Sequence, residues 1–126
     1  MKQPEKIAKP EGKLAVLLPG LGAVATTFVS GCLSARKGLT KPVGSLTQLG
    51  TIRLGKRSED RAPRIADFVP LATLDQLEFG AWDLFADDAL QSAEHAQVLE
   101  KHHLDPIRSE LQAIKPMKAA FYPEYV

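Results

Sequence analysis

The hydrophobic positions of this chain change their period close to its N-terminus. Leu14 to Leu18 form an unbroken apolar run, which is typical of a strand buried on both faces in a parallel sheet. Beyond Pro19 the apolar residues recur at steps of three and four and predict one stripe of a helix: Val24, Phe28, Cys32, Ala35 and Leu39. Gly38 is expected to end that helix, because glycine readily adopts the left-handed conformation that closes many helices.

The middle of the chain has a weaker pattern. We place a strand within residues 47–54, and an exposed loop at residues 56–63, which are charged and end in proline. Thr73 is expected to cap a short helical turn. The aromatic-rich segment from Phe79 to Phe85 predicts a strand that ends near Asp83.

Helical periodicity returns in the last third of the chain. Helices are predicted over residues 86–99 and 105–114, and a final strand over residues 119–122. The alternation of strands and helices predicts an α/β fold, with a partial Rossmann-like parallel sheet that is flanked by helices and incomplete. We expect residues 1–12 to form a flexible tail and residues 13–126 to form one domain.

Composition and charge narrow the possible partners. The 126 residues carry 16 basic and 15 acidic side chains, a formal net charge of +1, so bulk electrostatics indicate neither a nucleic acid nor a membrane as partner. No run of about 18 apolar residues is present that would span a membrane. The single cysteine, Cys32, excludes an internal disulfide and is expected to be a small core residue. A cytoplasmic protein is the simplest expectation.

The turn between the first strand and the first helix carries the clearest chemistry. Residues 20–25 match G-x-G-x-x-A, a variant of the dinucleotide-binding fingerprint. Gly20 lets the chain turn sharply, Gly22 removes a Cβ where a pyrophosphate approaches, and Ala25 allows close packing of the helix on the sheet. Backbone amides at the N-terminus of the helix then point at the phosphates. The alternative is a tight structural turn that binds no ligand.

One expected part of the fingerprint is missing. An acidic residue that holds the adenosine ribose normally follows about 20 positions later, but the first acid after Gly22 is Glu59. The intervening residues are basic and leave an NADP-linked oxidoreductase open as an alternative: Arg36, Lys37, Lys41, Arg53, Lys56 and Arg57. A solvated basic loop is the preferred explanation of these residues. Asp83, at the end of a predicted strand, is placed either to hold the ribose or to cap a helix.

Histidines do not add a metal site to this picture. His95, His102 and His103 are close in sequence, but no cysteine or other third ligand completes a tetrahedral set around them. We therefore expect structural or exposed histidines, and no metal.

Five blocks follow one another along the chain: the glycine turn, residues 44–48, residues 79–84, residues 110–116 and residues 122–126. In this order they resemble the myo-inositol-1-phosphate synthase family, and they are similar to its bacterial branch. The resemblance covers nearly the whole chain after Lys13. It implies NAD as the cofactor and assigns residues 13–126 to a truncated NAD-binding, Rossmann-like domain.

The resemblance also implies an activity and a site. Members convert glucose 6-phosphate to an inositol monophosphate by oxidation with NAD, aldol cyclisation and reduction with the same cofactor, and they assemble as homo-oligomers, tetramers in the family. The cofactor-binding residues implied for this chain lie in the glycine turn and after two strands: Gly20, Gly22, Ala23, Val24, Ala25, Asp83, Ala119 and Ala120.

Two departures from the family limit this expectation. Many members carry asparagines where this chain has Val24 and Ala25, so only backbone amides are left to contact the cofactor there. The family's chains are several times longer, and their lysine-rich catalytic region lies beyond residue 126, so no catalytic residue is expected here and the chain alone should be inactive. An alternative to part of an enzyme is a protein of a different class, a non-catalytic, Rossmann-like binding or interaction module.

Overall fold

Three parallel strands form the sheet within residues 8–125, the part of the chain that the computed structural model describes. They are β1 (Leu14–Pro19), β2 (Leu77–Asp83) and β3 (Met117–Lys118), hydrogen-bonded in the order β1-β2-β3. Leu14 pairs with Leu77 and Pro19 with Trp82, while Trp82 and Asp83 pair with the two residues of β3. The predicted parallel α/β fold is confirmed, and the strand predicted to end near Asp83 ends there.

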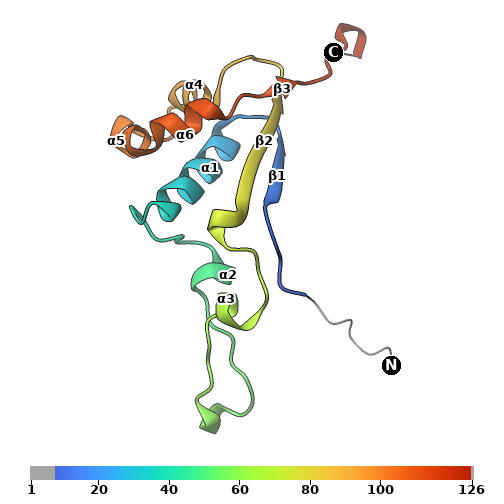
Figure 1. The fold of residues 1–126 in the computed structure, drawn as a ribbon. Helices are drawn as coiled ribbons and strands as arrows, with labels where there is room; N and C mark the ends of the chain where they lie inside the picture. The colour runs from blue at the N-terminus through green and yellow to red at the C-terminus, as the bar shows by residue number, and fades with distance from the viewer. Residues whose placement is uncertain (1–7, 126) are drawn as a thin grey trace.

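Helices connect these strands and lie on one face of the sheet (Figure 1). Helix α1 (Ala23–Arg36) follows β1, and α4 (Ala89–Ala96), α5 (Lys101–Leu104) and α6 (Arg108–Ala113) lie between β2 and β3. The strand order runs in one direction only, and right-handed crossovers then place both connections on the same face. Short 3-10 turns complete the described elements: Arg57–Glu59, Leu74–Gln76, Asp105–Ile107 and Pro123–Tyr125.

The N-terminal segment is only partly described. Residues 1–7 of the predicted tail lie outside the described residues. The end of the segment contacts the domain, because Gln76 Nε2 donates to the carbonyl oxygens of Pro10 and Gly12 at 3.3 and 2.9 Å.

The hydrophobic core lies between α1, the sheet and the helices after β2. Its largest fully buried side chains include Leu21, Leu104, Ile107, Leu111 and Val29. The face of α1 that is buried differs from the predicted stripe, in which Val24 is 85% exposed and Phe28 44% exposed. The buried face consists of Thr26, Val29, Ser30 and Leu33. The prediction was wrong because two of these four residues are polar and interrupt the apolar period.

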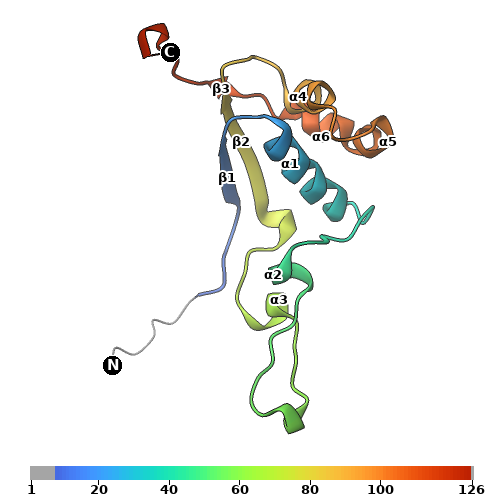
Figure 2. The same ribbon diagram turned by 180° about the vertical axis from the view of Figure 1, so that it is seen from behind.

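Strand β1 is also less buried than its apolar sequence predicts. Leu14 and Leu17 are 49% and 55% exposed, although both were expected to be covered. Among residues 8–125, β1 pairs on one side only, with β2, and the helices cover one face of the sheet (Figure 2). A strand that is apolar on both faces therefore lies here at the edge of the sheet.

The strand predicted within residues 47–54 is absent from the structure. Helix α2 (Leu46–Leu49) occupies the first part, and Thr51 and Leu54 form only isolated bridges, with Arg64 and Arg61. These bridges close an arm, residues 51–64, that extends from the end of the molecule opposite the glycine turn (Figure 1) and leads into α3 (Ile65–Phe68). The expected exposed loop at residues 56–63 forms the tip of this arm.

The predicted later elements are present with shifted bounds. Thr73 caps the turn Leu74–Gln76 as expected. Helix α4 begins only after Asp88, whose Oδ1 accepts a hydrogen bond from the Gln91 N–H at 2.9 Å, and ends where Gln97 turns left-handed at φ 54°. The second predicted helix starts earlier, at α5, and β3 precedes the predicted residues 119–122.

Candidate nucleotide-binding site

The glycine turn joins β1 to α1 and is fixed at three points. Gly20 has φ +108°, a conformation that side chains other than glycine rarely adopt. Its N–H donates to the Trp82 carbonyl at 2.8 Å. The Leu21 side chain is 1% exposed in the core, and its N–H donates to Asp83 Oδ2 at 2.7 Å. The turn is therefore held rigidly by the strand beside it.

Gly22 is a glycine for a different reason. Its φ of −83° is available to any residue, and a Cβ built on it would meet no protein atom within 4 Å. At Gly80, by contrast, a Cβ would meet Leu17 Cδ2 at 3.2 Å, so packing accounts for that glycine. Neither the backbone nor the packing of this chain requires a glycine at position 22. The bare backbone there fits a group that approaches from outside the chain.

The N-terminus of α1 presents free donors beside Gly22. The first N–H groups of any helix lack partners within the helix, and Gly22, the N-cap, supplies no side-chain acceptor for them. The hydroxyls of Thr26 and Thr27 bond to carbonyls of the same turn, at 3.0 Å to Gly22 and 2.7 Å to Ala23. No acidic residue lies in the first turn, so no side chain of α1 itself offsets the positive end of the helix dipole. An anion such as a pyrophosphate is favoured here.

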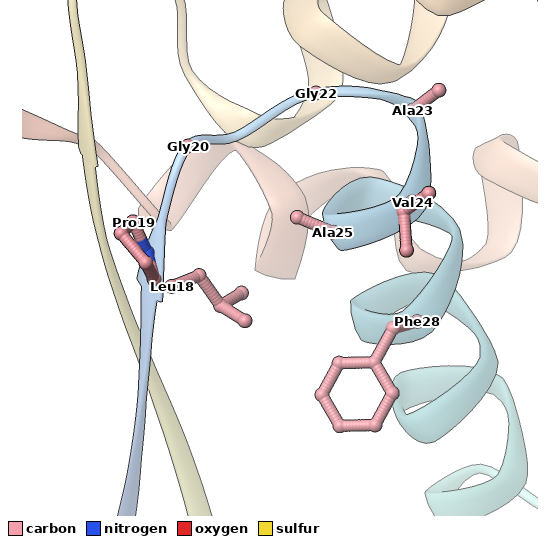
Figure 3. Close-up of a pocket in the computed structure, with 8 residues that line it drawn as sticks. All are labelled: Leu18, Pro19, Gly20, Gly22, Ala23, Val24, Ala25 and Phe28. Carbon is pink, nitrogen blue, oxygen red and sulfur yellow. The ribbon is translucent and has the colours of Figure 1, made fainter.

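A cavity of about 500 Å³ lies beside the turn, between β1 and α1. Its volume is in the range of small-molecule sites. Leu18, Ala25 and Phe28 point into the space between strand and helix, whereas Ala23 points away from the strand (Figure 3). The remaining lining residues are Pro19, Gly20, Gly22 and Val24. The cavity wall is apolar, and its polar part is the backbone of the turn.

Asp83 lies at the end of β2, next to the turn. Its Oδ2 accepts the N–H of Leu21, and its Oδ1 accepts the N–H of Phe85 at 3.1 Å. These two N–H groups, that of Leu21 foremost, hold the pKa of the Asp83 carboxyl below its ordinary value. The Asp83 carbonyl accepts the N–H of Ala119 at 2.9 Å, and exposed Ala120 follows. The structure thus brings together the predicted residues that follow the three strands, at the carboxyl-terminal ends of these strands.

The first two cations that follow the turn in the sequence contact other parts of the protein. Arg36 Nε donates to the Leu74 carbonyl at 2.6 Å, its Nη2 donates to Leu77, and its guanidinium lies over the Phe79 ring. Lys37 pairs with Glu110. Both lie at the far end of α1, a helix of 14 residues and therefore about 21 Å long. Neither is placed to hold a 2′-phosphate, which favours NAD over NADP.

The other candidate groups form no further centre in the described part of the chain. His102 Nδ1 lies 3.2 Å from Glu100 Oε2, and His103 Nδ1 accepts the Glu100 N–H. Residues 8–125 contain no cluster of three or more potential metal ligands. Burial raises the pKa of the Cys32 thiol, which disfavours the nucleophilic thiolate form. None of the helices described is both long enough and apolar enough to cross a membrane.

Three contributors to the site are not predicted by the fingerprint alone. Leu21 anchors the turn in the core, and Leu18 and Phe28 line the cavity. A large apolar residue between two glycines is a local signal for such an anchor. The bond between Leu21 and Asp83 joins residues 62 positions apart, so no local pattern could indicate it.

A parallel sheet with a glycine turn leading into the first helix defines a Rossmann-like α/β unit of the nucleotide-binding class. A family model for an NAD-binding domain, described as myo-inositol-1-phosphate synthase, matches residues 14–126. The chain belongs to the myo-inositol-1-phosphate synthase family, and NAD is the cofactor of that family.

Individual relatives agree with this assignment. The chain is 49% identical over 122 residues to inositol-3-phosphate synthase 1 of Bacteroides thetaiotaomicron, a match that covers 96% of this chain and 27% of that protein. It is 32% identical over 133 residues to the inositol-3-phosphate synthase of Candida glabrata, covering 94% and 24%. The chain therefore spans about a quarter of the length of these relatives.

A solved structure shares the fold. The crystal structure of inositol-3-phosphate synthase from Caenorhabditis elegans matches with a TM-score of 0.70 at 22% identity, over 86% of this chain and 24% of that chain. At this identity the likeness shows the arrangement of strands and helices only.

Proposed function

We propose that this chain is the NAD-binding part of an inositol-phosphate synthase. The backbone of Gly20, Gly22, Ala23, Val24 and Ala25 cradles the cofactor pyrophosphate, and Asp83, Ala119 and Ala120 complete the site at the same edge of the sheet. The observation that carries the proposal is Gly22, where the fold does not require a glycine but an approaching phosphate does.

The whole enzyme, in this proposal, converts glucose 6-phosphate to a myo-inositol monophosphate. Bound NAD supplies the oxidation and the later reduction that enclose the aldol cyclisation. The described residues of this chain contribute to binding: the turn donates hydrogen bonds and the N-terminus of α1 attracts negative charge. No described residue is assigned a catalytic role, so the 126 residues alone should leave glucose 6-phosphate unconverted. Assembly as a homo-oligomer and a cytoplasmic location are part of the same proposal.

Calorimetric titration of the chain with NAD and NADP tests the cradle. We expect NAD to bind, NADP to bind no better, and Gly22→Asp to bind neither, because its carboxylate meets the pyrophosphate with bulk and like charge. Aspartate is a better N-cap than glycine, so this variant should remain folded. Gly31→Asp is the matched control, because Gly31 is an exposed glycine of the same helix with open space at its Cβ.

If the chain is instead a non-catalytic interaction module, we expect it to bind neither NAD nor NADP. A chain that is folded by circular dichroism and binds neither nucleotide supports that alternative. Equal binding by the wild type and Gly22→Asp shows that nucleotides bind elsewhere and removes the cradle from the proposal.

A further inference from the structure

A row of hydroxyl side chains follows one face of α1. Thr27, Ser30 and Ser34 are spaced three and four residues apart, so they lie on the same side of the helix. They line a cleft of about 430 Å³ together with residues of the segment 99–106, which contains α5. The volume of the cleft is in the range of small-molecule sites. On this side, α1 therefore presents polar groups to a space that a ligand could fill.

Two of these hydroxyls have no hydrogen-bond partner among residues 8–125. Ser30 is 3% exposed and is the only buried residue of the cleft lining, yet its Oγ bonds to no described group. A buried polar group without a partner is rare, because it costs free energy. The half-buried Ser34 hydroxyl also has no partner in this part of the chain. Rotation about one side-chain bond changes the direction of either hydroxyl, so a ligand in the cleft can supply the missing partner.

Two histidines of α5 also line the cleft, and Glu100 engages Nδ1 of each. His103 Nδ1 accepts the Glu100 N–H at 3.2 Å, and His102 Nδ1 lies 3.2 Å from Glu100 Oε2. A neutral imidazole carries its proton on one nitrogen only. His103 is then left with an Nε2–H donor, whereas His102, whose Nδ1–H faces the carboxylate, is left with an Nε2 acceptor. The pair therefore offers a ligand one donor and one acceptor.

The remaining lining restricts the charge of a ligand. No lysine, arginine, aspartate or glutamate lines the cleft, so the charge-assisted hydrogen bonds that hold ionic ligands are not offered. Leu39, Leu99 and Pro106 contribute apolar surface. A matching ligand is neutral, carries groups that both donate and accept hydrogen bonds, and presents C–H surface between them. The hydroxyl is a group that does both.

We infer that the cleft between α1 and residues 99–106 is a binding site for a neutral polyhydroxyl compound, of the size of a monosaccharide or a cyclic polyol. This site is separate from the proposed cofactor site. The cavity beside the glycine turn is lined by residues 18–20, 22–25 and 28, and none of these lines the cleft. The inference goes beyond the proposed NAD-binding function and does not depend on it.

An NMR titration of the 126-residue chain with myo-inositol tests the site. We expect saturable shifts of the Ser30, Ser34 and His103 amides, with a dissociation constant in the millimolar range that is typical of small ligands with few contacts. Cyclohexanol has a similar ring with a single hydroxyl and should bind at least about tenfold more weakly, because it cannot form the other hydrogen bonds. Equal binding of cyclohexanol, or shifts that do not saturate, would overturn the inference.

Two serine variants test the groups that carry the inference. Ser30→Ala and Ser34→Ala should each weaken myo-inositol binding about 2- to 10-fold, the loss of one hydrogen bond. Both should remain folded, because alanine is smaller than serine and favours helices. Ser58→Ala, at an exposed serine of the arm, is the matched control and should bind as the wild type does. Unchanged affinity of Ser30→Ala would show that this hydroxyl turns to a carbonyl of its own helix, and the inference would fail.

Discussion

The two glycines of the turn are required for different reasons. At position 20 the backbone conformation requires a glycine, because few other residues adopt a φ of +108°. Gly22 has an ordinary backbone and open space around it, and we propose that a glycine is needed there by the cofactor phosphates. The fingerprint predicts both positions without separating the reasons. The structure separates them, and stability and binding should respond to the two residues differently.

Substitution of the two glycines by alanine should show this difference. Gly20→Ala forces an alanine into a strained conformation and should lower the free energy of unfolding by about 1–3 kcal/mol. Gly22→Ala should cost less, about 0.5–1 kcal/mol for the poorer N-cap, and should weaken NAD binding more than it weakens the fold. Urea unfolding followed by circular dichroism measures the first quantity and calorimetry the second. Equal losses of stability would contradict this explanation of the turn.

A half-exposed ion pair ties the end of α1 to α6. The Lys37 ammonium bonds to the Glu110 carboxylate, and this bond, with help from the Ser109 hydroxyl, lowers the pKa of Glu110 to about 2. A carboxyl whose pKa is lowered by folding stabilises the fold above its unfolded value, here 4.5, and loses that contribution as the pH falls towards 2.

Glu110→Gln should therefore destabilise the protein in a pH-dependent way. At pH 7 we expect a loss of about 0.2–1 kcal/mol, the range of partly exposed ion pairs, and near pH 2 the variant and the wild type should be equally stable. Urea midpoints across this pH range provide the measurement. Asp87→Asn serves as the control, and a Glu110→Gln loss that stays constant with pH would show that the pair is not the cause.

At the scale of elements, local signals predicted the ends of α1 better than its buried face. Gly38 ends the helix with φ +69°, and its N–H and that of Leu39 bond to Ala35 and Ser34, as expected for a left-handed helix stop. This geometry depends on a few neighbouring residues. The buried face depends on α4, which is distant in sequence, and its polar members Thr26 and Ser30 hide it from an apolar pattern.

Gly31 allows a test of how much the helix propensity of α1 contributes to the stability of the protein. It lies in the middle of the helix, is exposed, and has open space at its Cβ. Gly31→Ala should raise the free energy of unfolding by about 0.5–1 kcal/mol, because alanine loses less backbone entropy in a helix. Thermal unfolding would show this as a higher Tm with unchanged NAD affinity. An unchanged Tm would indicate that α1 is frayed at this point, and a lower Tm would contradict the open space around the added methyl group.

At the scale of the whole molecule, sequence alone predicted the α/β class, and it predicted candidate site residues that the structure brings together at the carboxyl ends of the strands. Parallel strands bring their carboxyl ends together, so the turn after β1, Asp83 and Ala119 had to meet. The exposure of Leu17 could not be predicted, because it depends on which further strands and helices surround the sheet. The strand predicted within residues 47–54 was wrong, because α2 occupies its first part and only two isolated bridges hold the arm at residues 51–64 together.

The small core should make stability depend on a few side chains. Leu111 on α6 is 0% exposed in the hydrophobic core, and Leu111→Ala should cost about 2–5 kcal/mol. Val24→Ala, at a position that is 85% exposed, should change stability by less than about 0.5 kcal/mol. Urea unfolding of both variants makes the comparison. Similar losses would mean that the core lies elsewhere.

The outer side of β1 has a consequence for how copies of this chain behave together. Its amide and carbonyl groups form a row that no described strand occupies, and such a row is a template onto which any extended peptide can add. Two residues at its ends limit this growth: Lys13 brings a charge before the strand, and Pro19 closes it with a residue that has no N–H to offer. Between them lie Leu14 to Leu18, five apolar residues in a row. At high protein concentration, aggregation of copies of this chain is expected to begin at this segment.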